Sequence, residues 1–351
     1  MPPRSWNISQ AQLAREKGVS QALVSLVLNG RKSGIKPGTY ERIWAHAIKR
    51  GYHPKGMQFA ASPTAAQPGQ VGYILRAPMR LNTLGFFFGN VHHGLHTALE
   101  KQGLTTVFLG SEDQLDSDRL HRLLPAGHHY RGLVLFGEVA RPFLDGLRQV
   151  EQRIVAVSAR YTGLCHSVLG NEPAALEQLV RHLHECGHRR FGWLGGNTGL
   201  GRHEARLAAF QAALARAGLT LPPRYTVVLT EADREEGTEA AHRLLAHAHR
   251  QDFPTALLCY NCLMAEGAAR AFAHAGWKIP ADLSIAGADT PRPPLPAEPL
   301  RITGTGTDPV QLGRAAASLL LASTGAEEEG FHDLMLPSRL ILGETTGPAK
   351  A

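Results

Sequence analysis

The chain has 351 residues, of which 43% are hydrophobic and 19% are charged, a composition typical of a globular protein with two or three domains. No apolar run approaches the roughly 18 residues of a transmembrane helix, and the first thirty residues lack the apolar core of a secretory signal. Four cysteines are too few for a disulfide framework in a chain of this length. These features exclude a transmembrane helix and a disulfide-stapled scaffold, and they predict a cytoplasmic protein.

The positive charge is concentrated near the N-terminus. Residues 1–60 contain ten Lys and Arg but only two acidic residues, Glu16 and Glu41, and therefore carry a net charge of +8. Because the whole chain carries +7, the other 291 residues sum to about −1. A compact cationic segment attracts a polyanion such as DNA, since each cation near a phosphate releases condensed counterions. A solvated basic tail would have the same composition.

Residues 8–52 predict three short helices. Ser9 and Gln12 form a candidate capping box for the first helix, and Ser20 caps the second after a short turn. Two helices joined in this way form a helix-turn-helix, whose second helix enters the major groove of DNA. The third helix starts near Pro37. The residues expected to face the inside of this unit are Ala11, Leu13, Ala14, Val24, Val27, Leu28, Ile43, Ala47 and Ile48.

Residues 53–69 read as a linker rich in proline and small residues, and apolar strands alternate with amphipathic helices from Val71 onward. The strands are expected at 71–75, 105–110, 131–137, 153–158, 190–196, 225–230, 255–261, 283–289, 331–337 and 339–346. The main helices are expected at 87–102, 173–186, 202–217, 235–249, 263–275 and 308–323. This alternation predicts an α/β core of two doubly wound parallel-sheet lobes behind an N-terminal all-α helix-turn-helix domain.

Several motifs resemble those of the LacI/GalR family of bacterial transcription regulators. Residues 8–30, ISQAQLAREKGVSQALVSLVLNG, are similar to its DNA-binding signature. Residues 182–196, HLHECGHRRFGWLGG, and 260–289, which begin YNCLMAEGAARAF, resemble two of its core motifs, and 336–347 resemble its last strand. The resemblance implies a helix-turn-helix domain at 1–54, a hinge or linker at 55–69, and an effector-binding and dimerisation core at 70–351. The core would resemble periplasmic binding proteins, with the chain crossing between its two lobes near residues 160, 290 and 327.

The resemblance implies that the second helix reads DNA bases while flanking residues contact phosphates. The matching positions are Ser9, Ser20, Gln21, Ala22, Ser25, Leu26, Asn29, Lys36, Thr39, Tyr52 and Lys55. Gln21 can read adenine by a bidentate contact, whereas Leu26 stands where the family often has arginine and offers only apolar contact, for instance with a thymine methyl group. A solvated helix face is the structural alternative for Gln21 and Ser25.

The hinge departs from the family pattern. Family members carry an Ala-Arg pair and then a leucine that enters the minor groove, whereas this chain has Gln58-Phe59, Ala61 and Pro63 at those places. Phe59 is a candidate substitute for the leucine. A flexible tether without a hinge helix is the alternative.

The resemblance also implies a ligand cleft between the lobes. The candidate effector-binding residues are Phe87, Phe88, Ser158, Arg206, Asn261 and Asp289. Ligands of parallel α/β sheets bind at the carboxyl ends of strands, and Asp, Asn and Arg with stacking Phe suit a polyhydroxylated ligand such as a sugar or nucleoside. Caps, turns and core packing are the structural alternatives. Cys262 stands where the family usually has Asp, which leaves the usual effector class open.

Other patterns carry little functional weight. His184 to His188 spell H-E-x-x-H, but Gly187 should end the helix before the second histidine, so no metal site is expected. No catalytic constellation and no cofactor motif is recognised. The sequence therefore predicts a homodimeric, sequence-specific DNA-binding regulator, most simply a nucleoid-associated repressor, that responds to a sugar-like or nucleoside-like molecule. The alternatives are an effector-unresponsive regulator, a solute-binding protein, and an enzyme with an appended DNA-binding domain.

Overall fold

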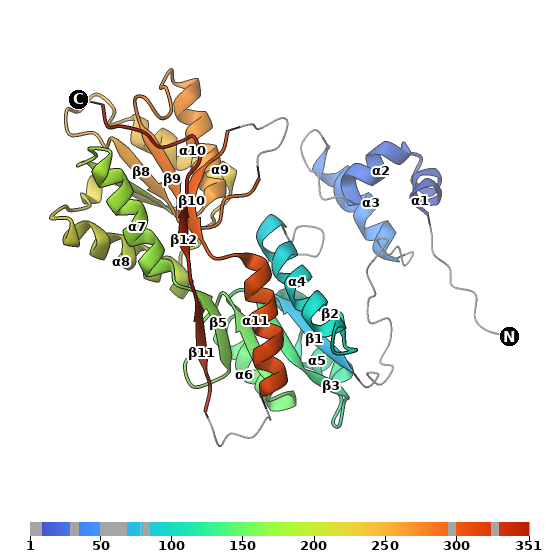
Figure 1. Cartoon of the computed structure of the whole chain (residues 1–351). Coiled ribbons are helices and arrows are strands. Elements are labelled where there is room, and N and C mark those ends of the chain that lie inside the picture. The colour runs from blue at the N-terminus through green and yellow to red at the C-terminus, as the bar shows by residue number, and fades with distance from the viewer. Residues whose placement is uncertain are drawn as a thin grey trace.

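The computed structural model describes residues 9–28, 35–49, 69–77, 79, 85–293, 300–323 and 330–350 (Figure 1). Three helices form the N-terminal unit: α1 Gln10–Lys17, α2 Gln21–Leu28 and α3 Pro37–Lys49. The later helices are α4 Gly85–Glu100, α5 Ser117–Leu123, α6 Arg141–Val150, α7 Glu172–Glu185, α8 Gly201–Arg216, α9 Arg234–Leu245, α10 Cys262–His274 and α11 Pro309–Ala322. None of the described helices is long and apolar enough to cross a membrane.

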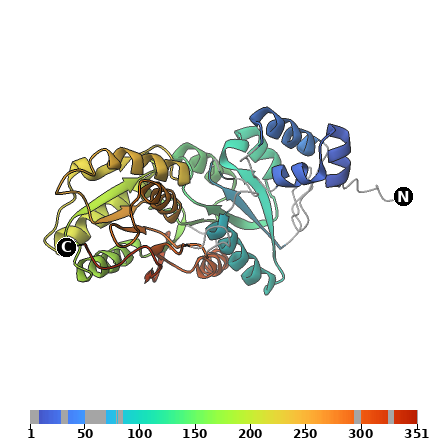
Figure 2. The same cartoon turned by 90° about the horizontal axis from the view of Figure 1, so that it is seen from above.

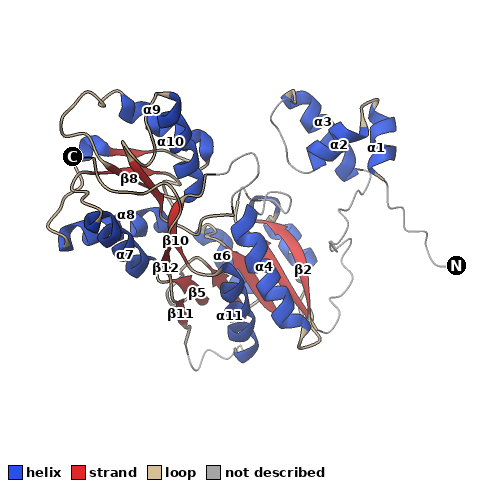
Figure 3. Cartoon of the chain, turned by 45° about the horizontal axis from the view of Figure 1, so that its top comes forward, coloured by secondary structure: helices blue, strands red, loops and turns tan. Residues whose placement is uncertain are grey.

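The strands belong to two sheets of six. The strands are β1 Gln70–Leu75, β2 Thr105–Ser111, β3 Tyr130–Phe136, β4 Ile154–Val157, β5 His166–Gly170, β6 Phe191–Gly195, β7 Thr226–Val228, β8 Ala256–Cys259, β9 Ser284–Gly287, β10 Thr303–Gly306, β11 Asp333–Leu336 and β12 Arg339–Ile341. The first sheet has the order β11-β5-β4-β3-β1-β2 and the second has the order β12-β10-β9-β8-β6-β7. Figure 2 shows the two lobes side by side, and Figure 3 shows helices flanking the strands of each. The predicted fold class is confirmed.

Short-range hydrogen bonds cap the first two helices of the N-terminal unit, as the sequence predicted. The Ser9 hydroxyl accepts a hydrogen bond from the Gln12 amide at 3.2 Å, and the Gln12 side chain accepts one from the Ser9 amide at 3.0 Å. Ser20 caps α2 by accepting from the amide of Leu23 at 3.1 Å. The capping predictions are therefore confirmed. The core of the unit contains Leu13, Ala14, Val24, Val27, Leu28, Ile43 and Ala47, all predicted. Ala11 is half-buried, and the side chain of Ile48 lies outside the described residues, as does the predicted hinge with Phe59, Ala61 and Pro63.

The first sheet is buried on both faces because its strands alternate between two apolar cores. In β3, Leu133 and Leu135 contribute to the core with α5 and α6. Val134 and Phe136 contribute to the opposite core, which α4 and α11 cover. Alternate residues of a strand point to opposite faces of the sheet, so an apolar strand without polar alternation is what a doubly covered sheet requires.

Two strands, β5 and β10, were not predicted. Their sequences are HSVLG and TGTG, which contain few large apolar residues. Both are nevertheless interior strands, β5 between β11 and β4 and β10 between β12 and β9. Their strand conformation therefore comes from backbone pairing with neighbours rather than from side-chain preference. Helix α9 also ends earlier than expected, at Leu245 rather than at residue 249.

The chain crosses between the lobes at later residues than the sequence predicted. The chain leaves the first sheet after Gly170, returns to the first lobe after Gly306, and leaves it again after Leu336. The first two points lie later than the predicted 160 and 290 because β5 and β10 extend each sheet by a strand. The third lies later than 327 because β11 pairs with β5 in the first sheet. Only Pro337 and Ser338 separate β11 from β12. The chain therefore continues through both lobes in one direction, and β12 pairs antiparallel with β10 (Figure 1).

Helices α4 and α11 pack closely through glycine. A Cβ added at Gly94 of α4 would lie 2.1 Å from the carbonyl oxygen of Val310, whereas a Cβ at Gly89 of the same helix would meet nothing within 4 Å. A backbone carbonyl cannot move away as a flexible side chain can, so the first substitution strains the helix pair.

We expect Gly94→Ala to lower the free energy of unfolding by about 1–3 kcal/mol, the usual cost of overpacking. Gly89→Ala is the matched control, and it should leave stability unchanged or raise it by up to about 1 kcal/mol, because alanine favours helix. Thermal and urea unfolding of the two variants measure the difference. Equal stabilities would show that the α4–α11 contact is looser than described.

Candidate functional site

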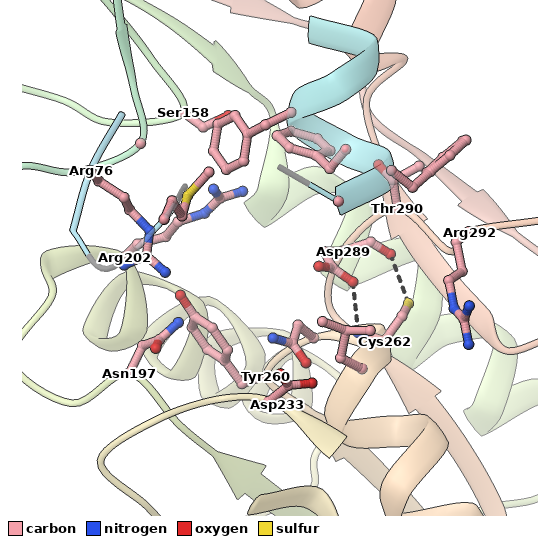
Figure 4. A pocket seen from close by; sticks show the side chains of 18 of the residues that line it. Arg76, Ser158, Asn197, Arg202, Asp233, Tyr260, Cys262, Asp289, Thr290 and Arg292 are labelled. Carbon is pink, nitrogen blue, oxygen red and sulfur yellow. Dashed lines mark hydrogen bonds between the residues drawn. The ribbon is translucent and has the colours of Figure 1, made fainter. Parts of the chain in front are cut away.

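A cavity of about 650 Å³ lies between the two lobes. Its wall in the first lobe includes Arg76 after β1 and Ser158 after β4, and its wall in the second lobe includes Tyr260 after β8 and Asp289 after β9 (Figure 4). The carboxyl ends of parallel strands meet at one edge of a sheet, so the cavity occupies the usual ligand position of such sheets. Its volume falls within the range of small-molecule sites, roughly 300–1,000 Å³.

All six residues predicted for effector binding line this one cavity: Phe87, Phe88, Ser158, Arg206, Asn261 and Asp289. They come from both lobes and from distant parts of the chain. The structure thus brings together the residues that the sequence analysis selected. Their contact with a ligand stays a prediction.

Arg206 is the most buried charged residue of the site, with 3% of its surface exposed. Its Nε and Nη2 donate to the two carboxylate oxygens of Glu172 at 3.1 and 2.9 Å, and its Nη1 donates to the Tyr260 carbonyl at 2.7 Å. The guanidinium also lies 4.7 Å from the centre of the Tyr260 ring. Arg202, one turn earlier on α8, donates to the same Glu172 carboxylate. These bonds fix both guanidinium groups at the edge of the cavity.

The charges in this cluster stabilise one another. Burial by itself would raise the pKa of the Glu172 carboxyl, but Arg202 and Arg206 outweigh it and lower the pKa to about 2. Burial opposes the charge of Arg206 as well, yet Glu172 raises its pKa above the usual value. Glu172 is therefore ionised throughout the physiological range, and the cluster carries one net positive charge.

Asn261 and Asp289 use polar atoms to cap helix α10. The Asn261 Oδ1 accepts from the amide of Met264 at 2.8 Å, and its Nδ2 donates to the carbonyl of Ala232 at 2.7 Å. The Asp289 Oδ1 accepts from the amide of Cys262 at 2.7 Å. The structural alternative considered for Asn261 and Asp289 is therefore present, and it leaves the second carboxylate oxygen of Asp289 for other partners.

Cys262 stands where the family usually has aspartate, and its thiol adds no second negative charge beside Asp289. Its thiol donates to the carbonyl of Asp289 at 3.3 Å. Burial, with the nearby charge of Asp289, raises the pKa of the Cys262 thiol well above its usual value, so the sulfur remains protonated. Burial also raises the pKa of the Asp289 carboxyl, although Arg206 opposes this shift. A Cβ at Gly287 would lie 2.5 Å from the sulfur, so the thiol fills space that β9 leaves free.

The first-lobe wall is largely aromatic. The rings of Phe87 and Phe88 meet edge to face with centres 5.0 Å apart, and Phe88 stacks on Phe136 at 6.0 Å. Two non-glycine residues at the cavity, Ser158 and Asn197, adopt left-handed backbone conformations with φ of 61° and 56°. Among the described residues these are the only non-glycine positions with positive φ. Such strain persists where the surrounding structure enforces it, often at binding sites.

Much of the charge in the cavity was missed by the sequence analysis. The missed charged residues at or beside it are Arg76, Glu138, Glu172, Arg202, Asp233, Arg234, Glu266 and Arg292. Arg202 had a local signal, because it lies four residues before Arg206 and therefore on the same helix face. The others are brought to the cavity by tertiary folding.

The residues predicted to contact DNA divide into three groups. Gln21, Ala22 and Leu26 are exposed on α2, with Leu26 at 37%, and Ser25 is half-buried. Ser9, Ser20 and Lys36 are exposed and Thr39 is half-buried, although the hydroxyls of Ser9 and Ser20 already cap helices. Asn29, Tyr52 and Lys55 lie outside the described residues. The exposed face of α2 therefore presents the side-chain amide of Gln21 together with the apolar side chains of Ala22 and Leu26.

The H-E-x-x-H pattern does not form a helical pair of histidines. Helix α7 ends at Glu185, and Gly187 has φ of 92°. The ring of His188 contacts the Thr255 hydroxyl at 2.9 Å and the Gly347 carbonyl at 3.0 Å. Both ring nitrogens therefore have protein partners that tie the C-terminal segment to the second lobe.

We expect Glu172→Gln to lower the free energy of unfolding by about 3 kcal/mol at neutral pH, because Arg206 would remain buried without a counter-charge. The loss should shrink as the pH falls from about 4.5, where the carboxyl protonates in the unfolded chain, toward about 2, where it protonates in the folded protein. Urea unfolding at a series of pH values measures this dependence. The control is Glu177→Gln on the same helix, which breaks only the exposed pair with Arg216 and should cost less than about 1 kcal/mol. A pH-independent loss would contradict the ionic role of Glu172.

Comparisons with known proteins agree with this architecture. The periplasmic binding protein-like domain family matches residues 180–346. The maltose regulon regulatory protein MalI of Escherichia coli strain K12 is 29% identical over 350 residues, covering 94% of this chain and 96% of that protein. The transcriptional repressor PurR of Yersinia enterocolitica is 26% identical over 340 residues, covering 94% of each.

A solved structure shows the same fold over nearly the whole chain. The lac repressor dimer bound to operator and the anti-inducer ONPF superposes with a TM-score of 0.65 at 19% identity, covering 97% of this chain and 99% of that one. The likeness includes the helical N-terminal unit and both lobes. Together with the motifs, the two lobes and the full-length relatives, it leads to one conclusion: the chain is similar over nearly its whole length to transcription regulators of the LacI/GalR family.

Proposed function

We propose that this protein is a transcriptional repressor that binds a near-palindromic operator as a homodimer and changes its operator affinity when a small molecule binds between the lobes. The observation that carries the proposal is the presence, in one chain, of a helix-turn-helix unit and an interlobe cavity lined by all six predicted effector residues. In this proposal residues 1–54 bind DNA, 55–69 form the hinge, and 70–351 bind effector and dimerise. The relatives are transcription regulators rather than enzymes.

The DNA-binding part of the proposal is supported by charge and exposure. The net charge of +8 in residues 1–60 supplies attraction to phosphate, and α2 presents Gln21, Ala22 and Leu26 to solvent. Two copies related by a twofold axis would place two recognition helices on adjacent half-sites. The lac repressor structure, which shares this fold, is a dimer on operator. A solute-binding protein would have no use for such a cationic unit.

The effector part is supported by the chemistry of the cavity. The rings of Phe87 and Phe88 offer an apolar face, and Arg202 and Arg206 offer oriented donors. Aromatic faces with a few fixed polar groups suit a sugar-like or nucleoside-like molecule. Ligand bound to both walls would hold the lobes at one angle, and the hinge that precedes β1 would transmit this angle to the DNA-binding units.

We expect the full-length protein to enrich one near-palindromic sequence from a random DNA pool, with affinity that falls steeply as salt rises. Gln21→Ala should weaken binding to that sequence by about 1–3 kcal/mol without changing the melting temperature, because the side chain is exposed. Gln251→Ala, an exposed glutamine of the second lobe, is the matched control. Failure to enrich any sequence, or a flat salt response, would refute operator binding.

We expect one member of a panel of sugars, nucleosides and their derivatives to raise the melting temperature of the free protein, because ligand binds only the folded state. The same compound should shift operator affinity by about 5–150-fold, the usual range of allosteric coupling. Binding without any shift in operator affinity would favour a regulator that has lost effector control.

A further inference from the structure

Arg76 enters the cavity from the first lobe along a path left open by a glycine. The residue directly follows β1, and its backbone amide donates to the Phe136 carbonyl at 3.1 Å. Gly137 lies beside it with φ of 88°, and a Cβ there would come within 2.6 Å of the Arg76 Cδ. A Cβ at Gly137 would crowd the arginine stem, so glycine leaves room for the Arg76 side chain, which lines the cavity (Figure 4).

Each carboxylate that lines the cavity already accepts at least one hydrogen bond from the protein, although the second oxygen of Asp289 is open. Glu138 of the first lobe accepts from the amides of Gly201 and Arg202 at 3.0 and 3.3 Å. Glu266 accepts from Arg234 and Arg292, in each case at 2.7 Å. Asp233 and Asp289 accept from backbone amides at helix starts.

Arg76 differs from these groups. Within the part of the chain that the structure describes, its guanidinium makes no hydrogen bond and no ion pair, although it lines the cavity. Burial lowers the pKa of Arg76 and the neighbouring charge of Arg202 lowers it further, whereas Tyr260, Glu138 and Glu112 oppose this shift without cancelling it. A half-buried cation without a partner costs stability, and a guanidinium is best matched by a carboxylate or phosphate that accepts two hydrogen bonds.

The N-terminus of α8 is a second place where an anion could bind, but the Glu138 carboxylate already occupies it. Helix N-termini attract anions, and here the Glu138 carboxylate occupies that position across the lobes. An anionic ligand therefore has Arg76, with the free Nη1 side of Arg202 nearby, as its remaining cationic partner. Figure 4 shows Arg76 and Arg202 on the same side of the cavity.

We propose that the ligand of this cavity carries an acidic group, a carboxylate or a phosphate, that pairs with the Arg76 guanidinium while the rest of the molecule packs on the Phe87 and Phe88 wall. The inference rests on the proposed function, because it names the chemical class of the effector in the same cleft. It separates this protein from regulators that take only neutral sugars or nucleosides.

The test compares matched ligands with the full-length protein at constant ionic strength. One set is glucose, glucuronate and glucose 6-phosphate, and the other is ribose, ribose 5-phosphate, uridine and uridine monophosphate. A charged member should raise the melting temperature more than its neutral partner, and the sugar set tells carboxylate from phosphate. Arg76→Met should lower affinity for the charged member by about tenfold or more and remove the preference. Arg141→Met removes one exposed cation of the same lobe and should change neither.

A second readout needs no ligand. Because the Arg76 guanidinium has no hydrogen-bond or ion-pair partner among the described residues, Arg76→Met should leave the melting temperature of the free protein unchanged or raise it, whereas a structural arginine would lower it. The proposal is overturned if Arg76→Met destabilises the free protein, if it retains the preference for charged ligands, or if no charged member of either set binds better than its neutral partner. Operator binding is measured separately, so its failure would refute the regulator and not the ligand class.

Discussion

The geometry of the cleft depends on one carboxylate that holds two arginines. Glu172 is the first residue of α7, directly after the chain leaves the first lobe, and it pairs with Arg202 and Arg206 of α8. Without this carboxylate, Arg206 would be buried as an uncompensated charge, which a protein interior tolerates poorly. The same bonds orient the guanidinium groups at the cavity edge, so a contact that stabilises the second lobe also prepares its ligand surface.

A second carboxylate connects the lobes. Glu138 extends from the first lobe to the amides at the start of α8 in the second. The lobes therefore share a polar contact that depends on their relative angle, in addition to the three chain crossings. Glu172 and Glu138 both bind α8, so under the proposed function a link between the occupancy of the cleft and the closure of the lobes would involve this helix.

The N-terminal unit and the cleft differ in their charge. The N-terminal unit carries the basic excess, and the cleft contains arginines that are mostly balanced by carboxylates. Because the core is nearly neutral, it does not compete with the N-terminal unit for phosphate groups. The positive charge of Arg76 lies in the cavity, so its attraction for anions is confined to that site. Under the proposed function, one chain would in this way bind a polyanion through its N-terminal unit and a small molecule in its cleft.

Elements with local signals could be predicted from the amino-acid sequence. Caps at Ser9 and Ser20, apolar strands such as β3 and β4, and the residues that follow strands, such as Asn261 and Asp289, could all be predicted, because each depends on neighbours along the chain. Folding in three dimensions was needed to form the strands β5 and β10, which pair between other strands, the ion pairs of Glu172 and Glu266, and the hydrogen bonds from Glu138 to backbone amides. Hydrogen bonds between strands and charges brought together from distant residues have no local pattern, since the partner is chosen only when the chain folds.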